Sequence, residues 1–332
     1  MKALRLHHPG RAEQRPLRLE EIPPPVPGPR EVRIRVRACG VCRTDLHLAE
    51  GDIPAGKLPL IPGHQIVGIV ESAGPGVRGL AVGERVGVPW LFSACGACSF
   101  CRAGRENLCG KALFTGCDVD GGYAEYVVAG EDAAYPLPPS CGSDAQAAPL
   151  LCGGVIGLRA LRLSGIEPGG VMGLYGFGAS AHIALQILLH WRCRVFVFTR
   201  STLHRELALS LGAAWAGGAQ DPPPELLDAA VIFAPSGDLV RAALSVMNRG
   251  AALALAGIHM TPIPPLEYRL LYHERSIRSV ANSTRADVRS MLELAEAASI
   301  RTRVETLPLE DANQGLRLLK ESRIAGSAVL LA

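Results

Sequence analysis

Four cysteines in the stretch SACGACSFCRAGRENLC have the spacing of a metal-binding loop. Two, two and seven residues separate Cys95, Cys98, Cys101 and Cys109, which lets one loop place four thiolates around a tetrahedral ion with no open position. An iron–sulfur cluster is the main alternative, but the bacterial ferredoxin run closes after three residues with Cys-Pro, whereas this run ends in NLCG. The spacing therefore predicts a structural zinc site.

A second set of metal ligands is dispersed along the chain. The stretches ACGVCRTDLH, IPGHQIVG and APLLCGG contain Cys42, His64 and Cys152. Two cysteines and one histidine form a ligand set that leaves a fourth zinc position for water or substrate. Each residue alone is a weak signal, because such a histidine is more often a turn residue and a lone cysteine is more often buried packing. Their combination favours a catalytic metal site.

The stretch LYGFGASA has the pattern of a dinucleotide-binding turn. Gly176, Gly178 and Ala181 follow the G-x-G-x-x-G/A arrangement after an expected strand and at the start of an expected helix. The first glycine permits the tight turn, the second lets a pyrophosphate approach the backbone, and the helix N-terminus offers amide groups to the phosphates. A plain structural turn is the alternative.

The next expected strand, VFVFTR, ends without the acidic residue that usually binds the adenosine ribose hydroxyls. Thr199, Arg200 and Ser201 stand there instead. A guanidinium with neighbouring hydroxyls suits a 2′-phosphate, so the sequence predicts that NADP(H) is preferred and that NAD(H) is possible. The alternative is that Arg200 is a solvated loop residue and that Thr199 tolerates either cofactor.

Two kinds of sequence pattern must position these residues. Up to about residue 149 the chain is rich in Gly and Pro, and the short runs EVRIRVRA, QIVGIVESAG and GERVGVPW indicate an all-β, barrel-like domain. From residue 151 the pattern changes to strand, turn, helix and strand, which is a βαβ unit. Strands at LDAAVIFAP, GAALALAG and SIRSVA, with helices at TLHRELALSLGA and LVRAALSVMNRG, predict a doubly wound parallel sheet. Helices at RADVRSMLELAEAA and EDANQGLRLLKES and a strand at AGSAVLLA follow.

Length and composition set the remaining bounds. A chain of 332 residues suggests two domains. Its 34 basic and 31 acidic residues are interspersed and give a net charge of +3, so neither nucleic acid nor a membrane surface is an expected partner. The N-terminus lacks the apolar core of a signal peptide, and no apolar run approaches the length of a membrane span. We expect a cytoplasmic protein with reduced cysteines.

With these residues assembled, the whole chain resembles the zinc-dependent alcohol dehydrogenases of the medium-chain dehydrogenase/reductase superfamily. The most specific matches are GVCRTDLH, PGHQIVGIVE, the four-cysteine lobe and LYGFGASA. The resemblance implies an α/β fold: a GroES-like, β-rich catalytic domain over residues 1–152 and 286–332, with a zinc lobe at about 93–110, interrupted by a Rossmann domain over residues 153–285. It also implies an active site in the cleft between the domains, and a homodimer or homotetramer.

The resemblance further implies two zinc ions per chain. The first set of cysteines would hold the structural ion, and Cys42, His64 and Cys152 would hold the catalytic one. Asp45 would orient His64, a common way to fix the tautomer of a ligating imidazole. Thr44 would hydrogen-bond the substrate oxygen, and His47 would relay the proton of the substrate to solvent through the cofactor ribose. Arg43 would reach the pyrophosphate of the cofactor, unless it is a solvated charge.

The substrate pocket is less well defined by the sequence. Trp90, Leu91 and Phe114 stand where the family's substrate channel is lined, and they would make it apolar, although each could equally be core packing. Gln65 stands where many family members have a glutamate. Because the glutamine side chain is neutral, it leaves the metal site less negative. No role is assigned to the other thiols, which are Cys39, Cys117, Cys141 and Cys193.

The expected activity is reversible hydride transfer between a primary or secondary alcohol, which becomes an aldehyde or ketone, and a nicotinamide cofactor. A polyol or sugar dehydrogenase of the same superfamily is the first alternative, and it would need a more polar pocket. A non-catalytic zinc protein that senses the nucleotide is an alternative of another class. Such a protein would hold one zinc ion per chain instead of two.

Overall fold

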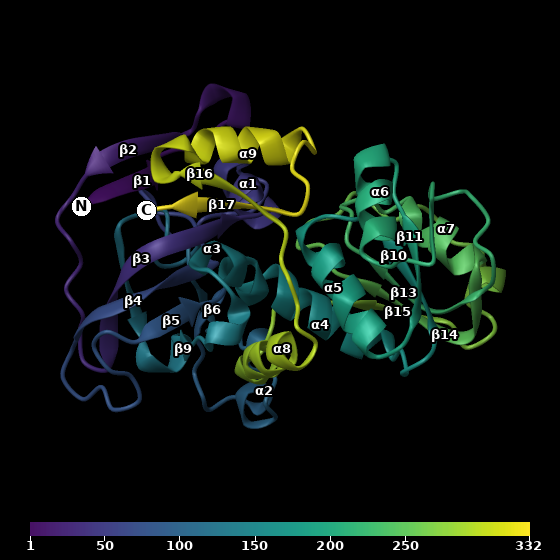
Figure 1. The fold of residues 1–332 in the computed structure, drawn as a ribbon, viewed down its shortest axis with the longest axis horizontal. Helices are drawn as coiled ribbons and strands as arrows, with labels where there is room; N and C mark the ends of the chain where they lie inside the picture. Colours follow the sequence, from purple (N-terminus) through teal and green to yellow (C-terminus); the bar gives the residue numbers. More distant parts are fainter. The chain divides into compact units, whose positions relative to one another are not determined.

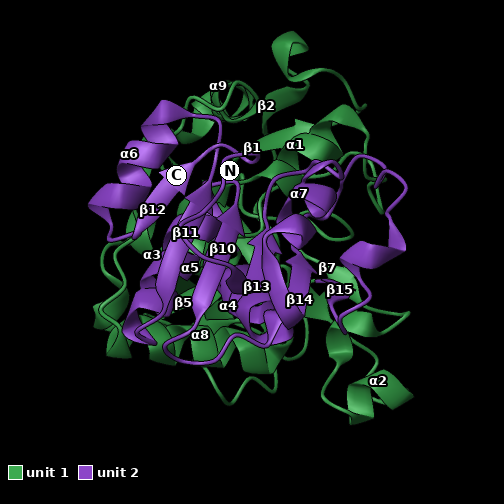
Figure 2. Ribbon diagram, turned by 90° about the vertical axis from the view of Figure 1, so that its right-hand side faces the viewer, with its two compact units in different colours: residues 1–152, 282–332 green, residues 153–281 purple.

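The computed structural model describes residues 1–332, and the chain divides into two compact units. Unit 1 holds residues 1–152 and 282–332, and unit 2 holds residues 153–281 (Figure 2). Unit 1 is therefore assembled from both ends of the chain, whereas unit 2 is one continuous segment.

Unit 1 is built on a seven-stranded sheet with the order β16-β17-β3-β4-β5-β9, and β8 also pairs with β3. Its strands are β3 (Glu31–Val41), β4 (Ile66–Ala73), β5 (Arg85–Val88), β8 (Tyr126–Gly130), β9 (Tyr135–Pro136), β16 (Val304–Pro308) and β17 (Ser327–Leu331). Along β3, alternate residues are buried up to Arg37, and from Ala38 onward every residue is buried. The strand predictions from EVRIRVRA, QIVGIVESAG and GERVGVPW are confirmed.

The C-terminal strand supports the centre of this sheet. It runs antiparallel beside the end of β3, with Ala328 opposite Val41 and Leu330 opposite Cys39 (Figure 1). The predicted C-terminal helices are present as α8 (Arg285–Ala297) and α9 (Ala312–Lys320), and the predicted terminal strand is β17. Smaller β pairs join β1 (Lys2–Leu6) to β2 (Leu17–Glu21) and β6 (Leu91–Ser93) to β7 (Leu113–Phe114).

The prediction that the first 149 residues are all-β is wrong in detail. They also form α1 (Arg43–Glu50), α2 (Ser99–Arg102) and α3 (Asp144–Ala147). Helix α1 begins because the Cys42 sulfur accepts the Thr44 N–H, and because the Asp45 carboxylate accepts the Cys42 N–H in return. It ends at Gly51, whose φ of 85° suits glycine. This helix carries the chemically interesting part of the stretch GVCRTDLH.

Unit 2 is a six-stranded parallel sheet with the order β12-β11-β10-β13-β14-β15 (Figure 2). Its strands are β10 (Val171–Tyr175), β11 (Arg194–Phe198), β12 (Trp215–Gly217), β13 (Leu227–Ile232), β14 (Met247–Leu255) and β15 (Ser276–Ser279). The associated helices are α4 (Gly153–Ser164), α5 (Ala179–His190), α6 (Thr202–Ser210) and α7 (Leu239–Ser245). The strand order reverses at β10, which is the arrangement of the doubly wound dinucleotide-binding fold, so the predicted Rossmann fold is confirmed.

Two local predictions in unit 2 need correction. The stretch LVRAALSVMNRG is helical only to Ser245, because Met247 begins β14. Arg275 donates to the carbonyls of Met247 and Asn248 and so holds this backbone away from a helix. Helix α4 has no counterpart in the sequence predictions. The helix begins with a glycine, a residue that weakens the helical pattern in the sequence. Glycine is needed there because a Cβ at Gly153 would lie only 3.3 Å from the backbone of α5.

The expectation that no apolar run approaches a membrane span is wrong for residues Asp144–Ser164. This stretch is long and apolar enough by composition, but 72% of its apolar 18-residue window is buried inside the structure. It is also interrupted by the 3-10 helix η5 (Ala148–Leu151) between α3 and α4. Burial in the protein explains its apolar composition.

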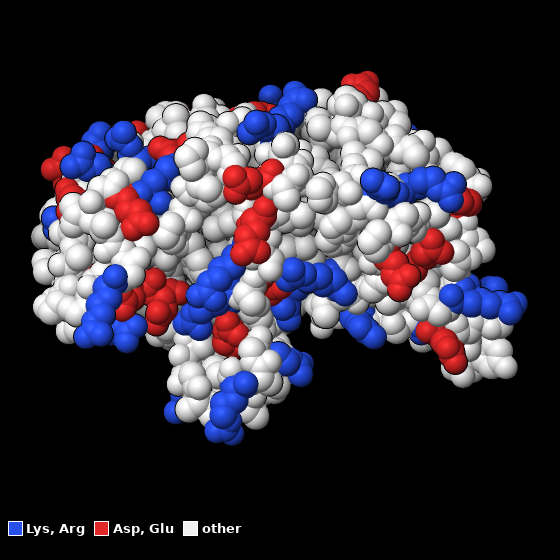
Figure 3. All heavy atoms as spheres, turned by 60° about the horizontal axis from the view of Figure 1, so that its bottom comes forward, with Lys and Arg blue, Asp and Glu red and all other residues white.

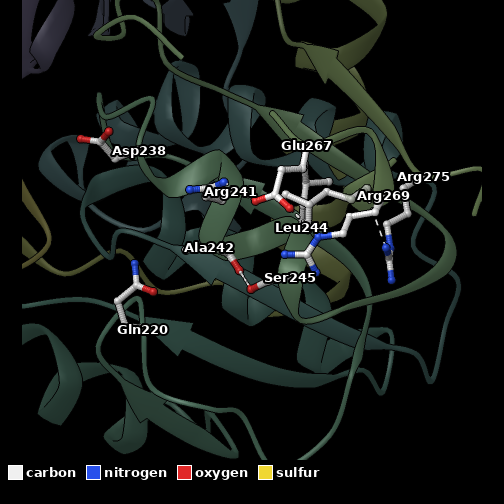
Figure 4. A pocket seen from close by; sticks show the side chains of 10 residues that line it. Gln220, Asp238, Arg241, Ala242, Leu244, Ser245, Glu267, Arg269 and Arg275 are labelled. Atoms are coloured by element: carbon white, nitrogen blue, oxygen red, sulfur yellow. Dashed lines mark hydrogen bonds and ion pairs between the residues drawn. The ribbon is translucent and has the colours of Figure 1, made fainter. Parts of the chain in front are cut away.

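A cavity of about 620 Å³ in unit 2 contains none of the predicted site residues. It lies beside α7, where Arg241 and Arg269 both bind Glu267 at 2.5 Å (Figure 4). Arg275 in its wall donates to three backbone carbonyls. These cations are paired within the protein, so we assign the cavity a structural role.

Basic and acidic side chains are also interspersed on the face of the molecule drawn in Figure 3.

Candidate functional site

Cys42, His64 and Cys152 come together in unit 1 from three separate segments. Cys42 follows the end of β3, His64 lies in the loop before β4, and Cys152 follows η5. One possible ligand atom from each residue lies within 4.8 Å of the other two. The structure therefore gathers the three residues that the sequence predicts as one metal site.

The geometry of this set fits a tetrahedral zinc ion. The Cys42 Sγ lies 3.2 Å from the His64 Nε2, close to the roughly 3.6 Å that zinc–sulfur and zinc–nitrogen bonds of ordinary length would span in a tetrahedron. Three protein ligands leave one position for substrate or water. The donor set can hold a catalytic type of zinc ion.

Asp45 connects the segments that carry the ligands. Its Oδ2 accepts the Cys42 N–H at 2.9 Å, and its Oδ1 accepts the Gly63 N–H and contacts the His64 Nδ1, both at 3.2 Å. A carboxylate can only accept, so the proton of the imidazole lies on Nδ1 and Nε2 faces the Cys42 sulfur. Asp45 is fully buried, and it fixes both the backbone and the tautomer of the site.

The surroundings of the set favour a thiolate. Burial opposes ionisation of Cys42, but a hydrogen bond with Cys152 and the charge of His64 outweigh it, and the pKa of Cys42 is well below its ordinary value. Burial likewise opposes the charge on His64, yet Cys42 and Asp45 raise the pKa of His64 to about 10. Without a metal ion, His64 at neutral pH therefore carries a second proton on Nε2, beside the one on Nδ1. A metal ion must displace this Nε2 proton, so metal uptake at neutral pH releases protons.

The other residues predicted from GVCRTDLH lie on the first turns of α1. Thr44 is buried, and its side chain bonds to the Cys42 sulfur, which helps to lower the pKa of that thiol. His47 is also buried, and its Nδ1 lies 2.8 Å from the Asp52 Oδ2. Arg43 is the first residue of the helix and is half-buried. Asp52 had no place in the sequence prediction, although a Gly-Asp pair after a helix is a recognisable signal.

An apolar wall lies beside the metal ligands. The Trp90 ring stacks on Phe114 at 5.2 Å and meets the edge of the His64 ring at 4.7 Å. The same cluster contains residues that the sequence analysis did not assign to a pocket, namely Leu48, Ile53, Ala55 and Cys117. Leu91 is buried but does not belong to this cluster, because successive side chains of an extended chain point to opposite sides. Gln65 is buried too, and its side chain lies against Gly40 of β3.

The four cysteines of the lobe are also gathered as predicted. A possible ligand atom from each of Cys95, Cys98, Cys101 and Cys109 lies within 4.8 Å of the others. The Cys95 and Cys101 sulfurs are 3.9 Å apart, close to the roughly 3.8 Å expected for two thiolates on one tetrahedral zinc ion. All ten cysteines of the chain are free thiols.

Backbone amides prepare the lobe for thiolates. The Cys98 N–H points at the Cys95 sulfur, the Cys101 N–H at the Cys98 sulfur and the Lys111 N–H at the Cys109 sulfur, at 3.4–3.5 Å. The backbone groups of Ala97 and Cys98 lower the pKa of Cys95 to about 6. Thiolates are the form that binds zinc, and three of the four sulfurs accept a backbone N–H. Burial and the neighbouring cysteines instead raise the pKa of Cys101 to about 12, so this thiol would lose its proton when a metal ion binds.

The predicted nucleotide turn in unit 2 joins β10 to α5. Gly176 has a φ of 85° and lies against Ala234, so both its conformation and its packing require glycine. Gly178 has an extended backbone, and a Cβ there would meet nothing within 4 Å. Neither backbone strain nor packing therefore requires glycine at position 178. The open space in front of the helix N-terminus suits a phosphate group, which a side chain would exclude. Ala181 is fully buried.

This difference between the two glycines yields a prediction. Replacing Gly178 by valine should weaken NADPH binding by about tenfold or more, because the side chain fills the space that a pyrophosphate needs. The melting temperature should stay within a few degrees of the wild type. Fluorescence titration with NADPH and thermal unfolding test the two expectations. In contrast, Gly176→Val should lower the melting temperature clearly, and equal stability losses in both variants would contradict this interpretation.

The residues predicted to read the cofactor lie beside this turn. Strands β10 and β11 are parallel neighbours, and the Gly176 N–H donates to the Phe198 carbonyl at 2.8 Å. Thr199 is buried, Arg200 is exposed, and the Ser201 hydroxyl caps α6 by accepting the His204 N–H. Thr199 and Arg200 thus stand next to the phosphate-binding turn, whereas the Ser201 hydroxyl is already engaged with the helix.

Comparisons with known proteins agree with this geometry. Residues 28–139 match the alcohol dehydrogenase GroES-like domain. A probable alcohol dehydrogenase, AdhA, from Mycobacterium tuberculosis (strain CDC 1551 / Oshkosh) is 48% identical over 100% of this chain and 97% of its own length. A thermostable alcohol dehydrogenase from Pyrobaculum aerophilum, solved with cobalt and zinc bound, has a TM-score of 0.90 at 27% identity and matches 100% of this chain and 99% of that one.

A second solved structure, of an NAD-dependent alcohol dehydrogenase, also has a TM-score of 0.90 at 27% identity, and the match covers 100% of both chains. Similarity over the full length includes both the metal-ligand segments and the nucleotide-binding turn. The chain therefore belongs to the zinc-dependent alcohol dehydrogenase family of the medium-chain dehydrogenase/reductase superfamily.

Proposed function

We propose that this protein is a zinc-containing alcohol dehydrogenase that interconverts primary or secondary alcohols and their aldehydes or ketones with a nicotinamide cofactor. The observation that supports it best is the set of Cys42, His64 and Cys152, with Asp45 behind the histidine. A bound zinc ion supplies a Lewis acid that stabilises negative charge on the substrate oxygen. The nicotinamide exchanges a hydride with the carbinol carbon.

The chain's own residues would handle the proton of this reaction. In alcohol oxidation the hydride leaves the carbon for the nicotinamide, and the hydroxyl proton must reach water. Thr44, whose side chain contacts the Cys42 sulfur, would hydrogen-bond the substrate oxygen. His47 follows it one turn later on α1 and would pass the proton on. Arg43 would contact the pyrophosphate of the cofactor.

The apolar wall favours simple alcohols over polyols. Trp90 and Phe114 stack beside His64, and Leu48, Ile53 and Cys117 extend the same cluster. Apart from the indole N–H of Trp90, which is a buried donor without a hydrogen-bond partner, the side chains of this cluster carry no nitrogen or oxygen atoms, so the wall offers few polar groups to several hydroxyls. We expect aliphatic and aromatic alcohols to be better substrates than sorbitol or glucose.

Four thiolates in the lobe would hold a second, structural zinc ion, which gives two ions per chain. Metal content distinguishes this proposal from a nucleotide-sensing protein without activity. Two zinc ions per chain support the enzyme, and one ion, in the lobe alone, contradicts it.

NADP(H) is the cofactor we propose as preferred, with NAD(H) possible. Arg200 is exposed beside the turn and can pair with a 2′-phosphate. We expect Arg200→Ala to lower kcat/KM for NADPH by about tenfold, the order of a lost charge-assisted hydrogen bond of about 1.5 kcal/mol, and to leave kcat/KM for NADH nearly unchanged. Arg249→Ala, which removes an exposed arginine of β14, is the control and should change neither value.

Initial rates of cofactor oxidation with short, branched and aromatic aldehydes test the whole proposal, run in parallel with NADPH and NADH. A clear rate that is higher with NADPH supports both the reaction and the cofactor preference. A preference for NADH keeps the reaction and rejects the role of Arg200. No rate with either cofactor, in protein that contains two zinc ions, contradicts the proposed reaction.

A further inference from the structure

The C-terminal end of α1 brings an acidic side chain back over the helix. Gly51 is left-handed, its N–H donates to the Leu48 carbonyl at 3.3 Å, and the Asp52 N–H donates to the His47 carbonyl at 2.9 Å. These two bonds form a Schellman motif, in which the residue after the glycine lies against the residue five positions before it. The motif usually joins two apolar side chains there. In this chain it joins Asp52 to His47.

The contact between these two side chains has a defined polarity. The His47 Nδ1 lies 2.8 Å from the Asp52 Oδ2. A carboxylate has only acceptor oxygens, so the imidazole carries its proton on Nδ1, and Nε2 of the neutral ring has the lone pair. The His47 side chain is 10% exposed and that of Asp52 is 44% exposed. The pair thus connects a buried imidazole to water.

The other carboxylate at this end of the helix has different partners. Glu50 accepts the Ala12 N–H at 2.9 Å and binds the Lys320 Nζ at 2.7 Å. Its charge is therefore compensated by α9 and by the N-terminal segment. Asp52 is the carboxylate that the fold directs to His47.

We propose that Asp52 is a positioning residue for the proton relay, which rests on the proposed alcohol dehydrogenase function. It holds His47 in the tautomer with hydrogen on Nδ1, so that Nε2 accepts the proton released from the alcohol by way of Thr44 and the cofactor ribose. The imidazolium that forms is stabilised by the adjacent carboxylate and then loses one proton to water. The hydride goes to the nicotinamide, so the step needs no other reactant.

The test compares Asp52→Ala and Asp52→Asn with Glu50→Gln in the zinc-loaded enzyme. Nitrogen-15 NMR of labelled histidine reports the tautomer, and the His47 signals are assigned by their loss in His47→Gln. We expect the Nδ1–H form in the wild type, a mixture of tautomers in Asp52→Ala and the wild-type form in Glu50→Gln. The kcat of alcohol oxidation should fall by about tenfold in Asp52→Ala, the order observed when a partner that orients a functional imidazole is removed, with little change in KM.

The asparagine variant separates orientation from charge. Its amide oxygen can still accept the Nδ1 proton, so the tautomer should persist while kcat takes an intermediate value. An unchanged tautomer in Asp52→Ala, or equal kcat losses in Asp52→Ala and Glu50→Gln, would overturn the inference. Absence of alcohol oxidation by the wild type would instead reject the proposed function, because the NMR comparison does not depend on turnover.

Discussion

Replacing Cys42 by alanine is expected to lower kcat/KM for alcohol oxidation by about a thousandfold or more. The change removes one of three ligands whose donor atoms lie within 4.8 Å of one another. Losing several kcal/mol of charge stabilisation at the substrate oxygen corresponds to a rate loss of about that size. Initial rates with ethanol and benzyl alcohol measure the effect, and zinc content should fall from two ions per chain to about one.

Cys39→Ala is the matched control for this variant. Cys39 is on β3, three residues before Cys42, is 1% exposed and lies against Gly63 and Gly122 instead of among the ligands. It loses the same thiol volume in the same sheet, so any packing effect should appear here as well. The control should retain two zinc ions per chain and most of the activity. Full activity in Cys42→Ala would contradict the assigned role of this residue.

Replacing Cys98 by serine is expected to release the second zinc ion and to destabilise unit 1. Cys98 accepts the Cys101 N–H and caps α2, so the lobe loses both a ligand and a local hydrogen bond. We expect zinc content of about one ion per chain. The melting temperature should fall by about 5–10 °C, which corresponds to a loss of about 2–3 kcal/mol in a unit of this size.

Cys141→Ser is the control for this second change, because Cys141 is buried in unit 1 and belongs to neither ligand set. Atomic emission measures the zinc content and calorimetry the unfolding. Residual kcat per catalytic zinc ion in Cys98→Ser should remain near the wild-type value at 25 °C, since the lobe supplies no group to the reaction. Two zinc ions per chain in Cys98→Ser would show that the four thiolates do not form one site.

Much of this fold could be predicted because short patterns carry it. The alternation in EVRIRVRA is enough to place β3, and the glycines of LYGFGASA, set between an apolar run and an amphipathic one, are enough to place β10, the turn and α5. Both patterns are local, and each is satisfied within about twenty residues. The cysteine spacing of the lobe is local as well.

Features that depend on distant partners escaped prediction. The end of α7 at Ser245 depends on Arg275, which binds the carbonyls of Met247 and Asn248 from about thirty residues away. Helix α4 begins at Gly153 because α5 needs the space that a side chain would fill. Within the site, the ligands were predicted from their chemistry. Leu48, Ile53 and Cys117 were not placed in the apolar wall, because their positions depend on how α1 and the neighbouring loops pack together.

Asp52 is a different kind of omission. The signal was present in the sequence as Gly-Asp directly after His47 and its helical neighbours. Interpreting it requires knowing that α1 ends in a Schellman motif, which sets the side chains of residues 47 and 52 side by side. Sequence analysis found the histidine from its chemistry, and the backbone geometry supplied its partner.

The pairing of β17 with the end of β3 has a consequence for synthesis on the ribosome. The residues just before Cys42 pair with Ala328 to Leu331, which are translated after the whole of unit 2. Unit 2 is one continuous segment and can fold while the chain is still growing. The sheet that presents Cys42 is completed only after unit 2 and the segment that contains β17 have both been translated. Zinc loading at this site is therefore expected to come later than folding of the nucleotide-binding unit.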